Sequence, residues 1–212
     1  MDEIVAAMAM LQHGDSFFPS GATSFSWGIE SLVADGCLTG PADARAFISG
    51  QLHARWAGFD LPAIIAAHRA AGDLDEIERI DALVEIQSSI AELRSASRRL
   101  GDAMLSVFER LGQDQARSYR SRVKKGRAHG HLPVVQGFVW ANAGHDEQAT
   151  IALSAHAFAV SLLGACIRLG CLGHLDAQRI LTALRDEIGE IASRPCLAPD
   201  RLSSCAFEAE IA

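Results

Sequence analysis

Aromatic residues are scarce in this 212-residue chain, where they make up 6% of the sequence and include a single tyrosine. Alanine and leucine far outnumber the β-branched and aromatic residues that favour strands. No run of alternating polar and apolar residues is long enough to indicate a strand, and no internal repeat or low-complexity linker is present. The sequence therefore predicts an all-α fold class, with one helical-bundle domain.

The chain also lacks an excess of basic charge and the cysteine density of a disulfide scaffold. Its formal net charge of −7 argues against a protein whose main role is to coat nucleic acid or an anionic membrane. Its five cysteines are odd in number and fit reduced thiols in a cytosolic compartment. The start of the chain has no basic region followed by an apolar run, so we expect no export signal and a cytoplasmic location.

Long apolar runs are rare as well, and residues 149–169 form the one segment long enough to span a bilayer. This segment carries Thr150, Ser154, His156 and Ser161. A helix that is apolar all round also belongs at the centre of a bundle. We therefore predict a buried core helix rather than a membrane span.

Apolar residues recur at helical spacing along most of the chain. We expect one domain over residues 1–194 and an irregular tail over residues 195–212. Periodicity is weakest over residues 112–130. The predicted helices cover residues 4–11, 25–33, 41–56, a new helix from 60, one after the Gly72-Asp73 stop, 93–111, 133–143, 147–169 and 175–192.

Catalytic motifs are missing or incomplete. Ser24 to Gly28 resembles a Gly-x-Ser-x-Gly hydrolase elbow, but the first glycine and the preceding strand are absent. We keep an independent hydrolase that uses Ser26 as a hypothesis to be excluded by an esterase assay. No Gly-x-x-x-x-Gly-Lys-Ser/Thr loop occurs, so nucleotide hydrolysis by that route is not expected.

Metal ligands occur in two short segments. Cys166, Cys171 and His174 offer sulfur and imidazole ligands for nickel or zinc, but their spacing matches no familiar metal motif. Buried cysteine commonly acts as a small apolar residue, so we expect the two cysteines in helix packing and no metal site. His129 and His131 flank Gly130 in a polar segment, and we expect them to be exposed.

Six basic residues and no acidic ones lie between Arg117 and Arg127, with Tyr119 among them. In a basic protein this run would suggest RNA binding. In an acidic one it indicates a solvated helix face or a patch for an acidic partner protein.

The segment from Asp15 to Glu30, DSFFPSGATSFSWGIE, resembles the N-terminal motif of the UreF family of urease accessory proteins. That motif has an Asp-Ser, then Pro-x-Gly, then a Phe-Ser-x-Gly-Leu-Glu-like stretch. Where the family tends to have Pro-Leu-Gly-Gln, this chain has Cys171-Leu172-Gly173-His174. Further matches follow in order at Asp60-Leu61-Pro62, Glu92-Leu93-Arg94 with Ser97 and Gly101, Pro133-Val134-Val135 with Gly137, and Arg168-Leu169 with Leu172-Gly173 and Asp176-x-Gln178.

The resemblance implies an all-helical chaperone, commonly a homodimer, that catalyses no reaction and uses no cofactor. It implies that the protein bridges two other accessory proteins during nickel insertion into urease. One docks on apo-urease (UreD/UreH type), and the other is the nickel-carrying GTPase (UreG type). We expect no nucleic-acid or membrane partner. An alternative is that the protein activates the GTPase by inserting Arg94 or Arg168 into its site.

The motifs and the tail together suggest a set of protein-binding residues. Pro19 and Gly21 are expected to form a turn, and Asp15 and Glu30 to cap helix ends, so a structural role competes with partner binding. The candidates are Asp15, Ser16, Pro19, Gly21, Glu30, Arg94, Arg168, Leu202 and Phe207.

The tail from Pro195 cannot continue the preceding helix, because Pro195 and Pro199 lack an N–H. We expect the tail to be mobile in the isolated protein and to become ordered on the urease-docking partner. Its apolar stripe would comprise Leu197, Leu202, Phe207 and Ile211. The alternative is that these residues fold back on their own bundle or on a dimer mate.

Overall fold

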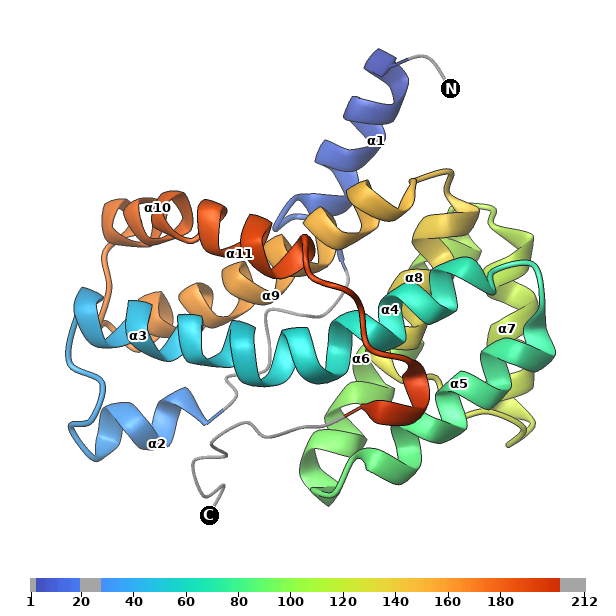
Figure 1. Ribbon diagram of the computed structural model, residues 1–212, viewed down its shortest axis with the longest axis horizontal. Helices are drawn as coiled ribbons and strands as arrows, with labels where there is room; N and C mark the ends of the chain where they lie inside the picture. Colours follow the sequence, from blue (N-terminus) through green and yellow to red (C-terminus); the bar gives the residue numbers. More distant parts are fainter. Residues whose placement is uncertain (1–2, 20–27, 203–212) are drawn as a thin grey trace.

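The computed structural model describes residues 3–19 and 28–202, which contain helices and no strand (Figure 1). The predicted all-α fold class is confirmed. The elements are α1 (Glu3–Gly14), α2 (Ile29–Ala34), α3 (Pro41–Gln51), the π-helical segment η2 (Leu52–Asp60), α4 (Leu61–Arg69), α5 (Leu74–Gln87), α6 (Ala91–Arg110), α7 (Asp114–Lys124), α8 (Leu132–Asn142), α9 (Glu147–Arg168), α10 (His174–Ala183), α11 (Arg185–Ala192) and the 3₁₀ turn η3 (Pro199–Arg201).

A continuous helical rod runs from Pro41 to Arg69 through α3, η2 and α4 (Figure 1). The α-helix α4 starts at Leu61, next to the predicted start at Asp60, but no loop separates it from η2. Pro62 lies inside the rod, two residues after the end of the π-helical segment, and Asp60 keeps right-handed helical backbone angles. The wider turns accommodate the ring and the missing N–H of proline, which would otherwise break an α-helix.

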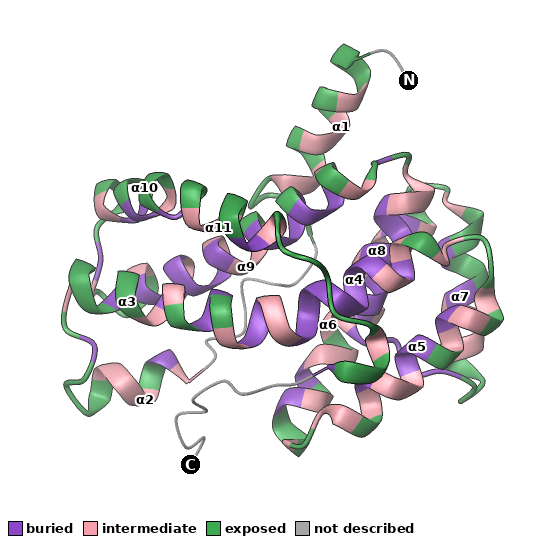
Figure 2. Ribbon diagram, viewed as in Figure 1, coloured by how far each residue is buried: buried purple, intermediate pink, exposed green. Residues whose placement is uncertain are grey.

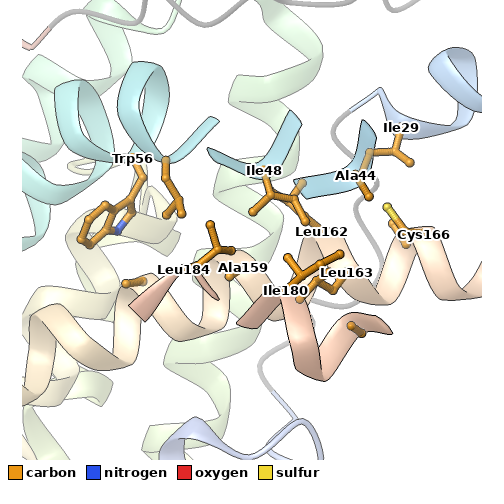
Figure 3. Packing of buried hydrophobic residues seen from close by; sticks show 14 of the residues in the cluster. Ile29, Ala44, Ile48, Trp56, Ala159, Leu162, Leu163, Cys166, Ile180 and Leu184 are labelled. Atoms are coloured by element: carbon orange, nitrogen blue, oxygen red, sulfur yellow. The ribbon is translucent and has the colours of Figure 1, made fainter. Parts of the chain in front are cut away.

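Two clusters of buried apolar side chains lie on either side of this rod. The first gathers side chains from α2, α3, η2, α9, α10 and α11, with Ile48, Trp56 and Leu162 among them (Figure 3). The second gathers side chains mainly from α4 to α8, and Phe59 belongs to it. Because Trp56 and Phe59 stand three residues apart in the rod, the same segment supports both clusters.

Helix α9 crosses the centre of the molecule behind the rod (Figures 1 and 2). It is long and apolar enough to cross a membrane, but 67% of its most apolar window is buried inside the protein. Its Ser154 hydroxyl accepts a hydrogen bond from Nε1 of Trp56 at 3.2 Å, so a polar group within the apolar run has a buried partner. The predicted buried core helix is confirmed.

Helix α7 occupies part of residues 112–130, the segment of the sequence with the weakest apolar periodicity. Ala116 and Tyr119 are buried, and Val123 packs against the same core. These three inward-facing residues are enough to attach α7 to the body of the protein, because arginines on its outer face also form ion pairs with carboxylates of neighbouring helices.

Helix α5 begins as the sequence indicated. The side chain of Asp73 accepts hydrogen bonds from the backbone N–H groups of Asp75 and Glu76 at 3.0 and 3.2 Å. In a capping box the Glu76 side chain would accept a hydrogen bond from the backbone N–H of Asp73. Here the Glu76 carboxylate pairs with Arg79 instead. The single helix expected over residues 175–192 is divided into α10 and α11, which abut at Leu184.

The described part of the tail turns back over the body of the protein and reaches α4 and α5 through η3. Leu202 is buried in the second core cluster, whereas Leu197 is exposed. Leu197 and Leu202 therefore do not share one exposed stripe. Leu202 fits the alternative in which the tail folds back. Phe207 and Ile211 lie outside the described residues.

Candidate functional site

Asp15 organises the turn that follows α1. Its carboxylate accepts a hydrogen bond from the backbone N–H of Phe17 at 2.8 Å, and its carbonyl oxygen accepts one from the N–H of Phe18 at 2.9 Å. This local bonding turns Phe18 inward, where its ring lies 5.5 Å from that of Phe108. Phe17 points outward and is 94% exposed. The Asp-Ser motif thus places an aromatic ring in solvent.

Helix α1 projects from the body of the protein (Figure 1) and has no fully buried residue. Four large apolar residues on one face of α1 are exposed, with Leu11 at 67%. We call them, together with Phe17, the α1 stripe. Contiguous exposed apolar surface on a soluble protein marks an interaction site. The members of the α1 stripe are Ile4, Val5, Met8, Leu11 and Phe17.

A pair of histidines holds the base of α1. Nδ1 of His13 and Nε2 of His145 lie 2.7 Å apart, so the two rings share a hydrogen bond. Burial and the neighbouring His145 lower the pKa of His13 from 6.5 to about 4. His145 is buried, and its carbonyl oxygen lies 2.9 Å from Nε2 of His68. The position of α1 therefore depends on two neutral imidazoles.

A second exposed surface lies at the far end of α9. Leu169 follows the last residue of α9, and Leu175 in the first turn of α10 is 71% exposed. Arg168, the last residue of α9, is exposed and has no ion-pair partner within the described residues. We call Arg168, Leu169 and Leu175 the α9-end surface. Arginine is enriched at protein interfaces relative to the rest of the protein surface.

Close backbone contacts account for the glycines of the family motifs. A Cβ atom on Gly101 of α6 would lie 1.9 Å from the carbonyl oxygen of Gly130, and one on Gly137 of α8 would lie 2.1 Å from that of Ile64. Neither position has room for a side chain. These two motif residues therefore serve helix packing.

Buried Asp81 of α5 holds the loop that precedes α8. Its carboxylate accepts hydrogen bonds from the backbone N–H groups of His129, Gly130 and His131 at 2.5, 2.8 and 2.9 Å. Asp81 cannot be recognised as this anchor from the sequence, because an aspartate on a helix gives no indication of a partner about fifty residues away. The expected exposure of His131 is wrong, since its side chain is fully buried.

Hydrogen bonds from His131 and Ser97 join α5, α6 and α8. Nε2 of His131 donates to Glu85 at 2.7 Å, and the Ser97 hydroxyl accepts from the N–H of Leu132 at 3.1 Å, which caps α8. Burial acts to raise the pKa of Glu85, but hydrogen bonds from Arg98 and His131 outweigh it and hold the value at about 2. The motif residue Ser97 is thus a capping group.

Arg94 has a structural role in the same region. Its Nη1 donates to the carbonyl oxygens of Ser88 at 2.6 Å and Ser89 at 3.3 Å, and its Nε lies 3.6 Å from Glu85. The side chain therefore closes the turn between α5 and α6. An arginine held by these contacts must break them to enter a partner protein.

A cavity of about 50 Å³ lies between η2, α6, α8 and α9. Arg55 and Asp60 form a buried ion pair at 3.3 Å on its wall. Burial raises the pKa of Asp60, and the charge of Arg55 partly offsets this. The volume suits ordered water, and typical ligand pockets are several times larger. Other lining residues include Trp56, Leu93, Ser97, Pro133, Gln136 and Phe158.

Most of the six basic residues from Arg117 to Arg127 form ion pairs within the chain. Arg120 pairs with Asp102 at 2.8 Å and Glu109 at 3.0 Å, and Arg122 pairs with Glu78 at 2.8 Å. Arg117 and Arg127 also face carboxylates, whereas Lys124 and Lys125 are exposed. The run is therefore mainly a set of ion pairs, and little of its charge is available to an acidic partner.

Cys166, Cys171 and His174, the conceivable metal ligands near the end of α9, do not come together as a set of three. Cys166 is buried and Cys171 packs against the same core, but His174 is exposed. No three His, Cys, Asp or Glu side chains come together as a metal site anywhere in residues 3–19 and 28–202.

The predicted protein-binding residues lie at several separate places. Asp15, Ser16 and Pro19 are exposed in the turn after α1, and Glu30 is exposed on α2. Arg168 lies on the α9-end surface. Arg94 and Leu202 are engaged in the body of the protein. Gly21, Phe207 and the candidate nucleophile Ser26 lie outside the described residues.

No sequence pattern indicates that the α1 stripe is exposed. Ile4, Met8 and Leu11 recur at helical spacing, and such a pattern normally faces the core. Only the position of α1, projecting from the body, shows that this face is exposed (Figure 2).

Comparison with known proteins agrees with the motif resemblance. The family model UreF matches residues 38–185. Urease accessory protein UreF of Trichodesmium erythraeum is 32% identical over 194 residues, covering 90% of this chain and 84% of that protein. Urease accessory protein UreF of Yersinia pseudotuberculosis is 31% identical over 182 residues, covering 84% of this chain and 79% of that protein. This chain therefore belongs to the UreF family of urease accessory proteins.

Proposed function

We propose that this protein is a cytoplasmic urease accessory chaperone that bridges the urease-docking accessory protein and the nickel-carrying GTPase during nickel insertion. It acts by contact and catalyses no reaction itself. Membership of the UreF family supports a role in urease maturation. The bridging role is supported by two separate exposed apolar surfaces.

The α1 stripe and the α9-end surface lie near opposite ends of α9. The base of α1 packs near Leu153, since a Cβ atom on Gly14 would be 3.2 Å from Cδ2 of Leu153. Arg168 ends α9 fifteen residues later, about 22 Å away at 1.5 Å per residue. Two partner proteins therefore have room to bind at the same time.

The two surfaces also differ in chemistry. The α1 stripe is a helical apolar face that suits a hydrophobic groove on a partner. The α9-end surface combines leucines with the cation Arg168, and it therefore favours a partner with a carboxylate beside an apolar patch. This difference supports binding of two unlike proteins rather than two copies of one.

Co-purification tests the proposal. The full chain is mixed at micromolar concentration with each partner alone and with both, in the presence and absence of guanine nucleotide. We expect a complex with each partner and a ternary complex with both. A folded protein that binds neither partner would refute the adaptor role, and mutually exclusive binding would refute the bridge.

We further propose that the protein is a homodimer. Its exposed apolar side chains would lose water contact in a dimer, and a stable interface buries about 800 Å² on each partner. Sedimentation of the isolated chain across a range of concentrations measures its mass directly. A monomer at all concentrations up to tens of micromolar would contradict this part.

A second candidate function is activation of the GTPase by an inserted arginine. The exposure of Arg168 favours it over Arg94, whose guanidinium is held by backbone carbonyl groups. An inserted arginine raises phosphoryl-transfer rates by about 10³ to 10⁵. If Arg168→Ala leaves GTP turnover unchanged while the GTPase still binds, activation through this residue is excluded.

A further inference from the structure

The chain leaves α9 through a Schellman motif that has a cysteine at each end. The backbone N–H of Cys171 donates to the carbonyl oxygen of Cys166 at 3.1 Å, and the N–H of Gly170 donates to that of Ile167 at 3.0 Å. Gly170 has a φ of 78°, the left-handed conformation that this motif requires. In such a motif the side chains of the two residues joined by the wider hydrogen bond, here Cys166 and Cys171, commonly contact each other.

The two thiols are neighbours in space. Sγ of Cys171 turns back toward α9 and lies 3.1 Å from the carbonyl oxygen of Cys166. Cys166 is buried in the first core cluster beside Ala44 and Ile29 (Figure 3), and Cys171 packs against that cluster. Burial, the charge of Cys171 and a hydrogen bond with its thiol together raise the pKa of Cys166 to about 12.

We propose that Cys166 and Cys171 form a reversible intrachain disulfide, with a low-molecular-weight disulfide such as oxidised glutathione as the oxidant. The Cys171 thiolate attacks one sulfur of the oxidant, forms a mixed disulfide and releases one small thiolate. The Cys166 thiolate then attacks Sγ of Cys171 and releases the second. The protein loses two electrons and two protons, and both protons end on the two small thiols.

The order of the two steps follows from burial. Cys171 is the more accessible thiol and reacts first, whereas Cys166 is shielded by the core. The Schellman hydrogen bond holds the two residues near the separation of about 4.4 to 6.8 Å between Cα atoms at which disulfides form.

The same features make the disulfide slow to reduce. An external thiol can reach Sγ of Cys171, and the group that must then leave is the Cys166 thiolate. A thiol of high pKa is a poor leaving group in thiol–disulfide exchange. Attack on Sγ of Cys166 is blocked by burial. The bond would also constrain the turn that carries Arg168 and Leu169.

A proline at position 171 would supply neither the thiol nor the N–H that closes the Schellman motif. The inference concerns thiol chemistry alone and does not depend on the proposed bridging role.

Peptide mapping tests the proposal. The reduced full chain is equilibrated in glutathione redox buffers, free thiols are alkylated, and trypsin is added. Cleavage after Arg127, Arg168 and Arg179 separates the two cysteines into peptides 128–168 and 169–179. We expect these peptides to be joined by a disulfide as the main product in oxidising buffer and to separate slowly when reduced glutathione is added.

Two variants serve as controls. Cys171→Ser must abolish the linked peptide pair, whereas Cys37→Ser, which removes an exposed thiol elsewhere, must leave its yield unchanged. If peptides 128–168 and 169–179 stay unlinked in a buffer that glutathionylates Cys37, the proposal is wrong. If the Cys166–Cys171 disulfide were reduced as fast as an exposed mixed disulfide on Cys37, the proposed slow reduction would be wrong.

Discussion

Gly137 in α8 faces the carbonyl oxygen of Ile64 in α4 so closely that a Cβ atom on Gly137 would lie only 2.1 Å from it. Both groups belong to helix backbones, so no side-chain rotation can relieve such a contact. The two helices would have to move apart within the second core cluster.

We predict that Gly137→Ala lowers the free energy of unfolding by about 2 kcal/mol or more, and Tm by roughly 4 to 8 °C. Gly50→Ala is the matched control, because Gly50 is exposed in α3 and has no atom within 4 Å of a Cβ position. It should be neutral or stabilising by up to about 1 kcal/mol. Thermal unfolding measures both, and equal Tm values would disprove the close-contact argument.

The second prediction concerns Asp81, which accepts three backbone hydrogen bonds in a buried site. Asp81→Ala leaves three N–H groups without their acceptor, at a cost of about 1 to 3 kcal/mol for each group. We expect a loss of at least about 3 kcal/mol in denaturant unfolding. Asp114→Ala removes an exposed carboxylate and should cost less than about 1 kcal/mol. Similar losses for both variants would contradict this view of Asp81.

The third prediction is that the base of α1 loosens in acid. The pKa of His13 is lowered from 6.5 to about 4 in the folded protein, so the unfolded chain binds more protons between these values. Stability from the neutral His13–His145 pair is therefore complete above pH 6.5 and is lost as pH falls toward 4. Burial lowers the pKa of His145, the charge of Asp146 partly counters this lowering, and His68 lowers the pKa further.

Hydrogen exchange of α1 amides from pH 7 to pH 4 measures this effect. We expect protection of α1 to fall with pH in the parent protein and to depend much less on pH in His13→Gln, which has no imidazole at that position. His174→Gln removes an exposed histidine and should behave like the parent. A pH dependence that survives in His13→Gln would assign the effect to other groups.

The fourth prediction separates the two proposed binding surfaces. Leu11→Asp combined with Phe17→Asp should abolish binding of one partner, and Leu175→Asp should abolish binding of the other. Folding should be unaffected, because all three side chains are exposed. Ile86→Asp is the control, since Ile86 is 78% exposed on α5, outside both surfaces. Loss of the same partner in both variants would mean that the surfaces do not serve different proteins.

Family motifs were recognisable from the sequence, but their roles were not. Ser97 and Gly101 stand in one motif and Gly137 in another, and the structure assigns them to a helix cap and two close backbone contacts. Such roles depend on atoms from α4 and from the loop before α8. A motif shared with a family can therefore reflect packing as well as partner binding.

The sequence by itself determined the all-helical architecture, the cap at Asp73 and the buried nature of α9, because these follow from local hydrogen bonding and the spacing of apolar residues. It also determined family membership through ordered motifs. Only the tertiary structure decided that α1 projects with its apolar face exposed, that Asp81 binds the loop before α8, and that Leu202 is buried. These features depend on contacts between distant segments, and no local pattern in the chain records which segments meet.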